Sequence, residues 1–275
     1  AETTIKLLNN ISNYKVLDKI LVVDNCSTDN SFQILKKCEN DKIEVIKTTI
    51  NKGYGAGINY GIKYLEKSYD DANIFISNAD IYIKQENDLA KLIKNINSDK
   101  YYIVAPIIDE NGYINRGWKI PTALKDSLMN IPYIHRYLRK KILNYKDKHY
   151  STKLSNVDVV SGCFLLTRIS YMNNIGYFDE NVFLYYEENI IAKKLKTIHK
   201  KTIINNSVII YHNHSVSVDK SINSLKKYRI LKKSQYYFHK NYNKSNYFTL
   251  LVLFLTNKAT YIILIFLYSF RKLKK

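Results

Sequence analysis

Short apolar runs that end abruptly in polar residues recur along the chain. The first is residues 20–23 (ILVV), a continuous β-branched run followed by Asp24 and Asn25. A continuous rather than alternating apolar run predicts a strand that is buried on both faces of a sheet. The polar residues 27–29 then suit the start of a helix. One alternative stays open, in which Asp24 and Asn25 only form a turn and residues 27–29 only cap the helix.

The same pattern returns further along the chain and predicts an α/β fold. Apolar residues at 5, 8 and 11 and at 58, 62 and 65 have helical spacing, which predicts one helix before the first run and another between later runs. Further strands are expected at 42–48 (KIEVIKT), 72–83 (ANIFISNADIYI), 101–108 (YYIVAPII), 156–168 (NVDVVSGCFLLTR) and in a last run from Ser207 to His212 (SVIIYH).

Polar and charged residues stand where several of these strands end. Three strands lead to Asp24, Asp80 and His212, and a helix begins at Glu187 and Glu188. In open α/β sheets, ligands bind at the carboxyl edge of the strands. We therefore expect these side chains to converge at one edge of the sheet. Taken singly, each has a structural alternative: a helix cap, a helix start favoured by the dipole, or a core histidine.

A glycine-rich stretch, residues 51–67 (NKGYGAGINYGIKYLEK), leads into a predicted helix. Its glycines at 53, 55 and 57 do not have the spacing of the dinucleotide-binding fingerprint, and no acidic residue follows at the required separation. Dinucleotide binding is therefore excluded. Small residues before a helix N-terminus do suit a close approach to phosphate.

The net charge and the cysteine content limit the possible binding partners and the cellular compartment of the protein. The 275 residues carry a formal net charge of +19, which suits a nucleic acid, an anionic membrane or a phosphorylated substrate. The three cysteines, at 26, 38 and 163, are odd in number and have no paired spacing. This argues against a disulfide framework or a zinc site and favours a reducing, cytosolic setting.

The C-terminal region, residues 225–275, differs from the domain expected over residues 1–224. A basic and aromatic stretch is followed by two apolar runs that Thr256-Asn257-Lys258 separate. One spanning helix would place Lys258 near the bilayer centre. We therefore expect an interfacial hairpin or pair of helices at a membrane. The alternative is a C-terminal helix packed on the domain.

The beginning of the sequence is a predicted helix rather than a strand. A doubly wound domain normally begins with a strand, so we expect the start to be truncated or processed, with a first strand missing.

Six motifs, in order, give the chain a family resemblance. They are VVDNCSTDNS, NKGYGAGINYGI, SNAD, SGCFLLTR, GYFDENVFLYYEENI and YHNHSVS, and they cover residues 1 to about 217. The chain resembles an inverting family 2 glycosyltransferase of the rhamnosyltransferase-like type that makes capsular or cell-surface polysaccharide. The resemblance implies the GT-A fold: a mostly parallel, Rossmann-like sheet flanked by helices, here with a C-terminal helical membrane-associating segment.

The resemblance also implies roles for individual residues. Glu188 matches the catalytic base, supported by Glu187. Asp80 and His212 match the site of a divalent metal, Mg²⁺ or Mn²⁺, although Asn78 makes the first position of that motif an amide. The expected nucleotide-sugar ligands are Asp24, Asn25, Asp29, Asn51, Gly53, Asn59 and Asn78. Trp118 and Arg116 are candidates to bind the acceptor, and core packing is an equal alternative for both.

The expected reaction is hexosyl transfer from a nucleoside diphosphate sugar to a glycan or a lipid-linked acceptor. Its oxocarbenium-like transition state needs a carboxylate base, and the leaving diphosphate needs a cation. We expect a cytoplasmic protein, peripheral on the inner face of the cell membrane. The acidic and Asn-rich strand ends argue against a nucleic-acid partner. A nucleotidyltransferase and a non-enzymatic basic binder of membrane or nucleic acid remain the alternatives.

Overall fold

The computed structural model describes residues 1–96, 100–130, 141–213 and 224–273. Residues 214–217, the end of the last sequence motif, lie outside the described residues. In chain order the elements are α1 (Glu2–Ile11), β1 (Ile20–Asp24), α2 (Ser31–Lys36), β2 (Ile43–Lys47), α3 (Tyr54–Leu65), β3 (Asn73–Ser77), β4 (Ile81–Tyr82), α4 (Glu86–Ile96), β5 (Tyr101–Glu110), β6 (Tyr113–Asn115), α5 (Ala123–Met129), the 3-10 helix η1 (Asp147–Tyr150), β7 (Leu154–Val157), β8 (Phe164–Arg168), α7 (Ile169–Asn174), α8 (Glu187–Thr197), β9 (Lys201–His212), α10 (Ser224–Asn241) and α11 (Tyr247–Leu273).

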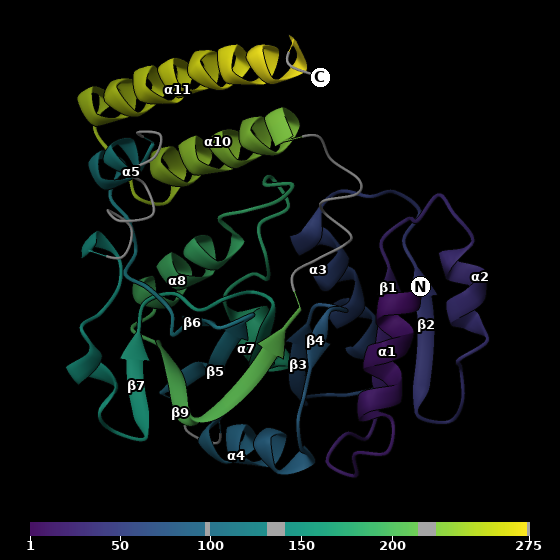
Figure 1. The fold of residues 1–275 in the computed structure, drawn as a ribbon. Helices are drawn as coiled ribbons and strands as arrows, with labels where there is room; N and C mark the ends of the chain where they lie inside the picture. The colour runs from purple at the N-terminus through teal and green to yellow at the C-terminus, as the bar shows by residue number, and fades with distance from the viewer. Residues whose placement is uncertain (97–99, 131–140, 214–223, 274–275) are drawn as a thin grey trace.

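Two sheets, with helices around them, form the α/β architecture (Figure 1). β1 and β2 pair in parallel as a two-stranded sheet, and the larger sheet has the order β3-β8-β5-β9-β4, with β6 on β5 and β7 on β9. The expectation of a mostly parallel sheet is wrong. In the larger sheet β5 and β9 pair in parallel, whereas β8 is antiparallel to β3 and β5, and β4 and β7 are antiparallel to β9. The continuous apolar runs indicated burial, which a strand inside a mixed sheet also has.

The predicted convergence at one sheet edge holds for Asp80 and His212 but not for Asp24, which ends β1 in the separate two-stranded sheet. Because β8 runs antiparallel to both β3 and β5, these two strands run in the same direction, and β9 is parallel to β5. The ends of β3 at Ser77, of β5 at Glu110 and of β9 at His212 therefore share one edge, together with the start of β8. This edge carries Asp80, Glu110 and His212.

The hydrophobic core lies on the larger sheet. Val104 of β5, Leu166 of β8, Ile210 of β9 and Leu92 of α4 are completely buried. The strand β1 is only half-buried apart from Asp24, so the expectation that it is buried on both faces is wrong. It lies in the small two-stranded sheet, where α3 covers it.

The helix α5 and the two C-terminal helices, α10 and α11, pack together as one layer (Figure 1). The expected break at residues 256–258 is wrong, because α11 is one continuous helix of 27 residues. Two of the three polar residues there face inward: the Asn130 amide nitrogen lies 3.2 Å from Thr256 Oγ1 and 2.6 Å from Asn257 Oδ1, whereas Lys258 is exposed. These contacts accommodate the polar residues inside the layer, so the helix continues through them. Residues 247–267 are long and apolar enough to cross a membrane.

Candidate active site

The end of β1 and the turn before α3 form the first part of the site. Asp24 is buried, and its Oδ1 accepts a hydrogen bond from the Ser27 amide at 2.7 Å. Its Oδ2 is buried and has no hydrogen-bond partner among the described residues. The Asn25 amide donates to the Gly53 carbonyl at 2.9 Å and lies 3.3 Å from Asn51 Oδ1, which also accepts from the Gly53 amide. Four of the predicted donor residues are thus brought together, and one carboxylate oxygen is left for a ligand.

Gly53 lets the turn press against a distant segment. Its φ of +109° is a conformation that favours glycine, and a Cβ there would lie 2.1 Å from the Phe183 carbonyl oxygen. The next amide, of Tyr54, donates to that same oxygen at 2.9 Å. The turn therefore contacts the segment that leads to Glu187 and Glu188.

Tyr54 and Gly162 connect this turn to the acidic pair. The Tyr54 hydroxyl donates to the Gly162 carbonyl at 2.6 Å, and the Gly162 amide lies 3.2 Å from Glu188 Oε1. Burial raises the pKa of Tyr54 well above its usual value, and the Glu188 carboxylate raises it further. The hydroxyl therefore stays protonated and acts as a donor. A side chain at position 162 would meet Glu188, since a Cβ there would lie 2.9 Å from its Oε1.

Glu187 and Glu188 begin α8 in different surroundings. Glu187 is 3% exposed, and its Oε1 has no hydrogen-bond partner among the described residues. Burial, with the neighbouring Glu188 as a second cause, raises the pKa of Glu187 to about 8. Glu188 is half-buried and faces Gly162. At neutral pH Glu187 is therefore mostly protonated, and Glu188 is the more accessible of the two carboxyl groups.

Asp80, His212 and Glu110 gather at the shared strand edge. His212 Nε2 lies 3.1 Å from Asp80 Oδ1, and His212 Nδ1 lies 3.8 Å from Glu110 Oε1. The hydrogen bond to Asp80 is the largest cause that raises the pKa of His212 to about 11, followed by contacts with Cys163 and Glu110. In the part of the chain that is described, no group of three or more His, Cys, Asp or Glu side chains forms a ready metal cage. The pair nevertheless fits a metal held mainly by diphosphate and water, because a carboxylate and an imidazole at this separation are suitable ligands once the histidine gives up its proton.

Three other predicted donor residues have different surroundings. Both hydrogens of the buried Asn59 amide are engaged, by the Phe178 carbonyl at 3.0 Å and by Glu180 at 2.9 Å. Asp29 is exposed and accepts from the Ser31 amide at the start of α2. The Asn78 amide donates to the Cys163 carbonyl at 2.8 Å, beside Asp80. The contacts of Asn59 and Asp29 favour structural tasks, whereas Asn78 lies at the strand edge beside Asp80.

The two acceptor candidates lie in different places. The Trp118 indole nitrogen lies 3.3 Å from Asn189 Oδ1, in the first turn of α8 and next to Glu188. Arg116 instead packs its guanidinium over the Tyr150 ring, 5.2 Å from the centroid, and lies 3.7 Å from Asp147. Only Trp118 is brought to the acidic pair by these contacts.

Sequence reasoning missed Tyr54, Glu110 and Gly162 as members of the site. Glu110 follows an apolar strand in the same way as Asp24, so the strand-end pattern was sufficient to find it. Tyr54 is one of 25 tyrosines and is singled out only by a contact 108 residues away.

The chain is similar to known proteins in sequence and in fold. The model of a family described as "Glycosyl transferase family 2" matches residues 1–175. A low-salt glycan biosynthesis hexosyltransferase, Agl10 of Haloferax volcanii, is 28% identical over 172 residues, which are 62% of this chain and 50% of that protein. The chain thus spans about half the length of this relative.

Two solved structures share the fold at low sequence identity. The mannosyltransferase PcManGT from Pyrobaculum calidifontis, in complex with GDP-Man and Mn²⁺, is 13% identical with a TM-score of 0.58, covering 94% of this chain and 70% of that one. GalNAc-T7 with UDP, GalNAc and Mn²⁺ is 14% identical with a TM-score of 0.56, covering 74% of this chain and 39% of that one. These likenesses show the GT-A fold that the sequence predicted.

Proposed function

Because the chain belongs to glycosyl transferase family 2, we propose that it transfers a hexose from a nucleoside diphosphate sugar to an acceptor hydroxyl with inversion. The observation that carries this proposal is the position of Gly162. Its carbonyl accepts from the hydroxyl of Tyr54, which belongs to the Gly53–Tyr54 turn, and its amide faces Glu188. Gly162 thus joins the turn proposed to approach the donor phosphates to the proposed base. This arrangement suits a reaction between a donor and an acceptor.

The proposed chemistry is a single displacement. The acceptor oxygen forms a bond to the anomeric carbon while the bond from that carbon to the diphosphate oxygen breaks, and the hydroxyl proton moves to a Glu188 carboxylate oxygen. Glu187, protonated at neutral pH, adds no second full charge beside this base. Attack on the face opposite the leaving group inverts the anomeric configuration.

The donor is proposed to bind along the edge that Asp24 and Asp80 delimit. The unpartnered Asp24 Oδ2 is suited to accept from a nucleobase or ribose, and the Gly53–Tyr54 turn allows a close backbone approach. Asp80 and His212 would hold a divalent ion on the diphosphate, where it would neutralise the charge that develops on the leaving group. Both similar solved structures contain Mn²⁺.

The membrane part of the proposal rests on the inverted polarity of α11. Its polar residues Asn257 and Thr260 bond inside the layer, whereas large apolar side chains face outward. The most exposed are Tyr247, Phe248, Leu255, Ile262 and Phe266. Exposed apolar surface of this extent marks an interaction site. We propose that α11 lies in the plane of the cytosolic membrane face, with residues 1–224 as the transferase domain and residues 225–275 as the membrane-facing region.

This orientation suits an acceptor in cell-surface polysaccharide synthesis. A lipid-linked acceptor hydroxyl would reach Glu188 from the membrane, while the nucleoside diphosphate sugar would arrive from the cytosol. The Haloferax volcanii relative, by its name, acts in glycan biosynthesis.

Calorimetry tests the metal-dependent donor site directly. GDP-mannose and UDP-linked hexoses are titrated with Mn²⁺ or Mg²⁺ present and again with a chelator. We expect binding only with the metal, and Asp80→Asn should weaken it about tenfold to hundredfold. Asp29→Asn is the matched control, because Asp29 is exposed at a helix start, and it should bind donor normally. Equal affinity in chelator would refute the metal role.

A further inference from the structure

The turn immediately before the acidic pair has a strained backbone. Tyr185 and Tyr186 both have φ of +71°, which side-chain-bearing residues rarely adopt. The Tyr186 carbonyl accepts the first helical hydrogen bond of α8, from the Ile190 amide at 3.0 Å. The orientation of Tyr186 therefore fixes how α8 begins and where Glu187 and Glu188 lie. Such a conformation persists only where surrounding contacts hold it.

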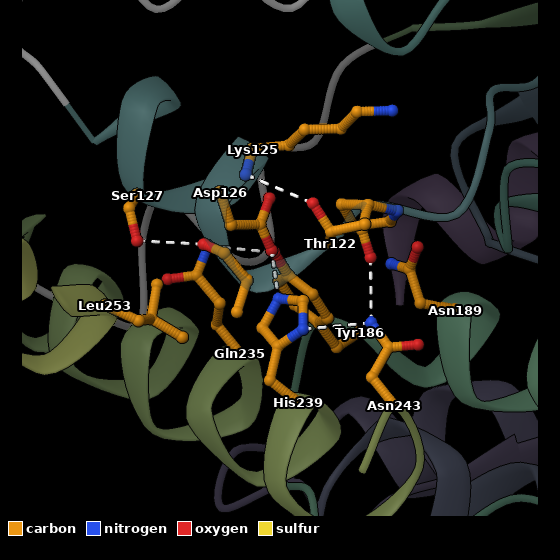
Figure 2. Close-up of polar contacts among 12 residues, drawn as sticks. Thr122, Lys125, Asp126, Ser127, Tyr186, Asn189, Gln235, His239, Asn243 and Leu253 are labelled. Atoms are coloured by element: carbon orange, nitrogen blue, oxygen red, sulfur yellow. Dashed lines mark hydrogen bonds and ion pairs between the residues drawn. The ribbon is translucent and has the colours of Figure 1, made fainter. Parts of the chain in front are cut away.

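Side chains of α5 and α10 supply those contacts. The Tyr186 hydroxyl donates to Asp126 Oδ2 of α5 and accepts from the Gln235 amide of α10 at 2.9 Å. The Tyr186 ring packs against the fully buried Phe238, with centroids 5.5 Å apart. Figure 2 shows Tyr186, Asp126 and Gln235 close together between the two helices.

Asp126 is itself held by His239 of α10. His239 Nε2 lies 2.6 Å from Asp126 Oδ2, and the two side chains are 0% and 1% exposed. The Asn243 amide nitrogen, which also donates to the Pro121 carbonyl, lies 3.0 Å from His239 Nδ1. Since an amide nitrogen donates, Nδ1 accepts and the ring hydrogen sits on Nε2, directed at Asp126. One carboxylate oxygen thus accepts from both His239 and Tyr186.

α10 and the residue that follows it also contact the segment before the acidic pair, at Leu184 and Asp179. Ser234 donates to the Leu184 carbonyl at 2.8 Å. Tyr237 and Tyr242 both donate to Asp179 Oδ2, at 2.9 and 2.7 Å. α10, with Tyr242 just after its end, therefore holds residues 179–186, the segment immediately before Glu187.

We propose that Asp126, held by His239, is a positioning residue that orients Glu188 through the Tyr186 hydroxyl. This proposal rests on the proposed function for the role of Glu188, and it makes α5 and α10 part of the active site. A buried carboxylate–imidazole pair adds little net stability compared with apolar packing. What it supplies here is one defined geometry for a backbone turn that is otherwise unfavourable.

The deciding variant is Tyr186→Phe, which removes one hydroxyl and keeps the ring against Phe238. Its matched control is Tyr228→Phe, because that hydroxyl bonds the Asn257 carbonyl at 3.1 Å between α10 and α11 and makes no hydrogen bond to residues 179–186 in the described part of the chain. Two readouts are compared in the full chain: amide hydrogen exchange over 179–188, and release of GDP or UDP from GDP-mannose and UDP-glucose with Mn²⁺.

Tyr186→Phe should speed exchange over 179–188 and lower kcat, each on the order of tenfold, with the donor KM little changed. Tyr228→Phe should change neither. Asp126→Ala should act like Tyr186→Phe, and Asp126→Asn, which keeps an accepting oxygen, should restore most of the loss.

Tyr186→Phe indistinguishable from Tyr228→Phe in exchange would overturn the positioning role, and so would faster exchange with an unchanged kcat. A parent chain that releases no nucleotide would instead contradict the proposed function. The exchange comparison then decides by itself whether Asp126 orders the turn.

Discussion

The proposed donor edge at β1 and α3 and the layer of α5 and α10 both hold residues 179–186, the segment before Glu187, but they use different kinds of contact. The donor edge uses short polar motifs and backbone groups, such as the Phe183 carbonyl that accepts from the Tyr54 amide. The layer uses side chains that are 60 and 113 residues apart in sequence, namely Tyr186 with Asp126 and His239 with Asp126. Chemistry-bearing motifs can therefore be local while the contacts that orient them are not.

Glu188→Gln replaces the proposed base, which follows the segment that both regions hold, and should have the largest effect on kcat. The substitution keeps the shape of the side chain but removes the basic carboxylate, so kcat should fall about 10² to 10⁴-fold. Donor affinity should stay close to that of the parent, because the base acts on the acceptor. Steady-state kinetics and donor calorimetry measure the two quantities.

Glu187→Gln is the control for this experiment. Glu187 is already mostly neutral at pH 7, so its replacement should lower kcat far less. Parental turnover in Glu188→Gln would contradict the assignment, and a large loss in Glu187→Gln alone would move the base to Glu187.

Gly53→Ala breaks the contact on the donor side. The new Cβ would lie 2.1 Å from the Phe183 carbonyl oxygen, and a backbone oxygen cannot move aside without shifting the segment. We expect a loss of about 3 kcal/mol in the free energy of unfolding. Gly112→Ala shares the positive φ but meets nothing within 4 Å, so it should cost only about 1 kcal/mol. Chemical denaturation measures both, and equal losses would mean that the close approach has no energetic role.

Polar substitutions on α11 probe the outer face of the layer. Leu255→Gln with Phe266→Gln should weaken co-sedimentation with anionic vesicles by about tenfold or more, because both side chains are exposed and would enter the lipid. Ile114→Gln removes an exposed apolar residue of β6 and should leave vesicle binding unchanged. If all the variants bind vesicles like the parent, α11 is not the membrane contact.

The pH dependence of stability tests the buried carboxyl group of Glu187. Burial raises the pKa of Glu187 to about 8, so the folded chain retains a proton that the unfolded chain releases near pH 4.5. This contribution to stability is complete below pH 4.5 and is lost as the pH rises through 8. Relative to Glu187→Gln, which cannot titrate, the parent should lose about ten degrees of melting temperature between pH 5 and 9. A constant difference would show that Glu187 titrates normally.

The sequence predicted the strand endings of the site because these are local. An apolar run followed by Asp24, Asp80 or His212 can be recognised within a few residues. Asp80 and His212 meet at one edge once the strands of the larger sheet align, whereas Asp24 ends β1 in the other sheet. The direction of β8 could not be predicted in this way, because a buried strand has the same apolar pattern whether it is parallel or antiparallel to its neighbours. Asp126 and His239 are separated by 113 residues, and nothing near either of them distinguishes a buried partner from a surface residue.

The position of Trp118 has an optical consequence. It is the only tryptophan of the chain, and its indole nitrogen lies beside Asn189 in the first turn of α8. Indole emission follows local polarity and hydrogen bonding, so the intrinsic fluorescence of this protein reports on one place, the neighbourhood of Glu188. Any ligand that rearranges the start of α8 should therefore change the intrinsic emission spectrum, without an added label.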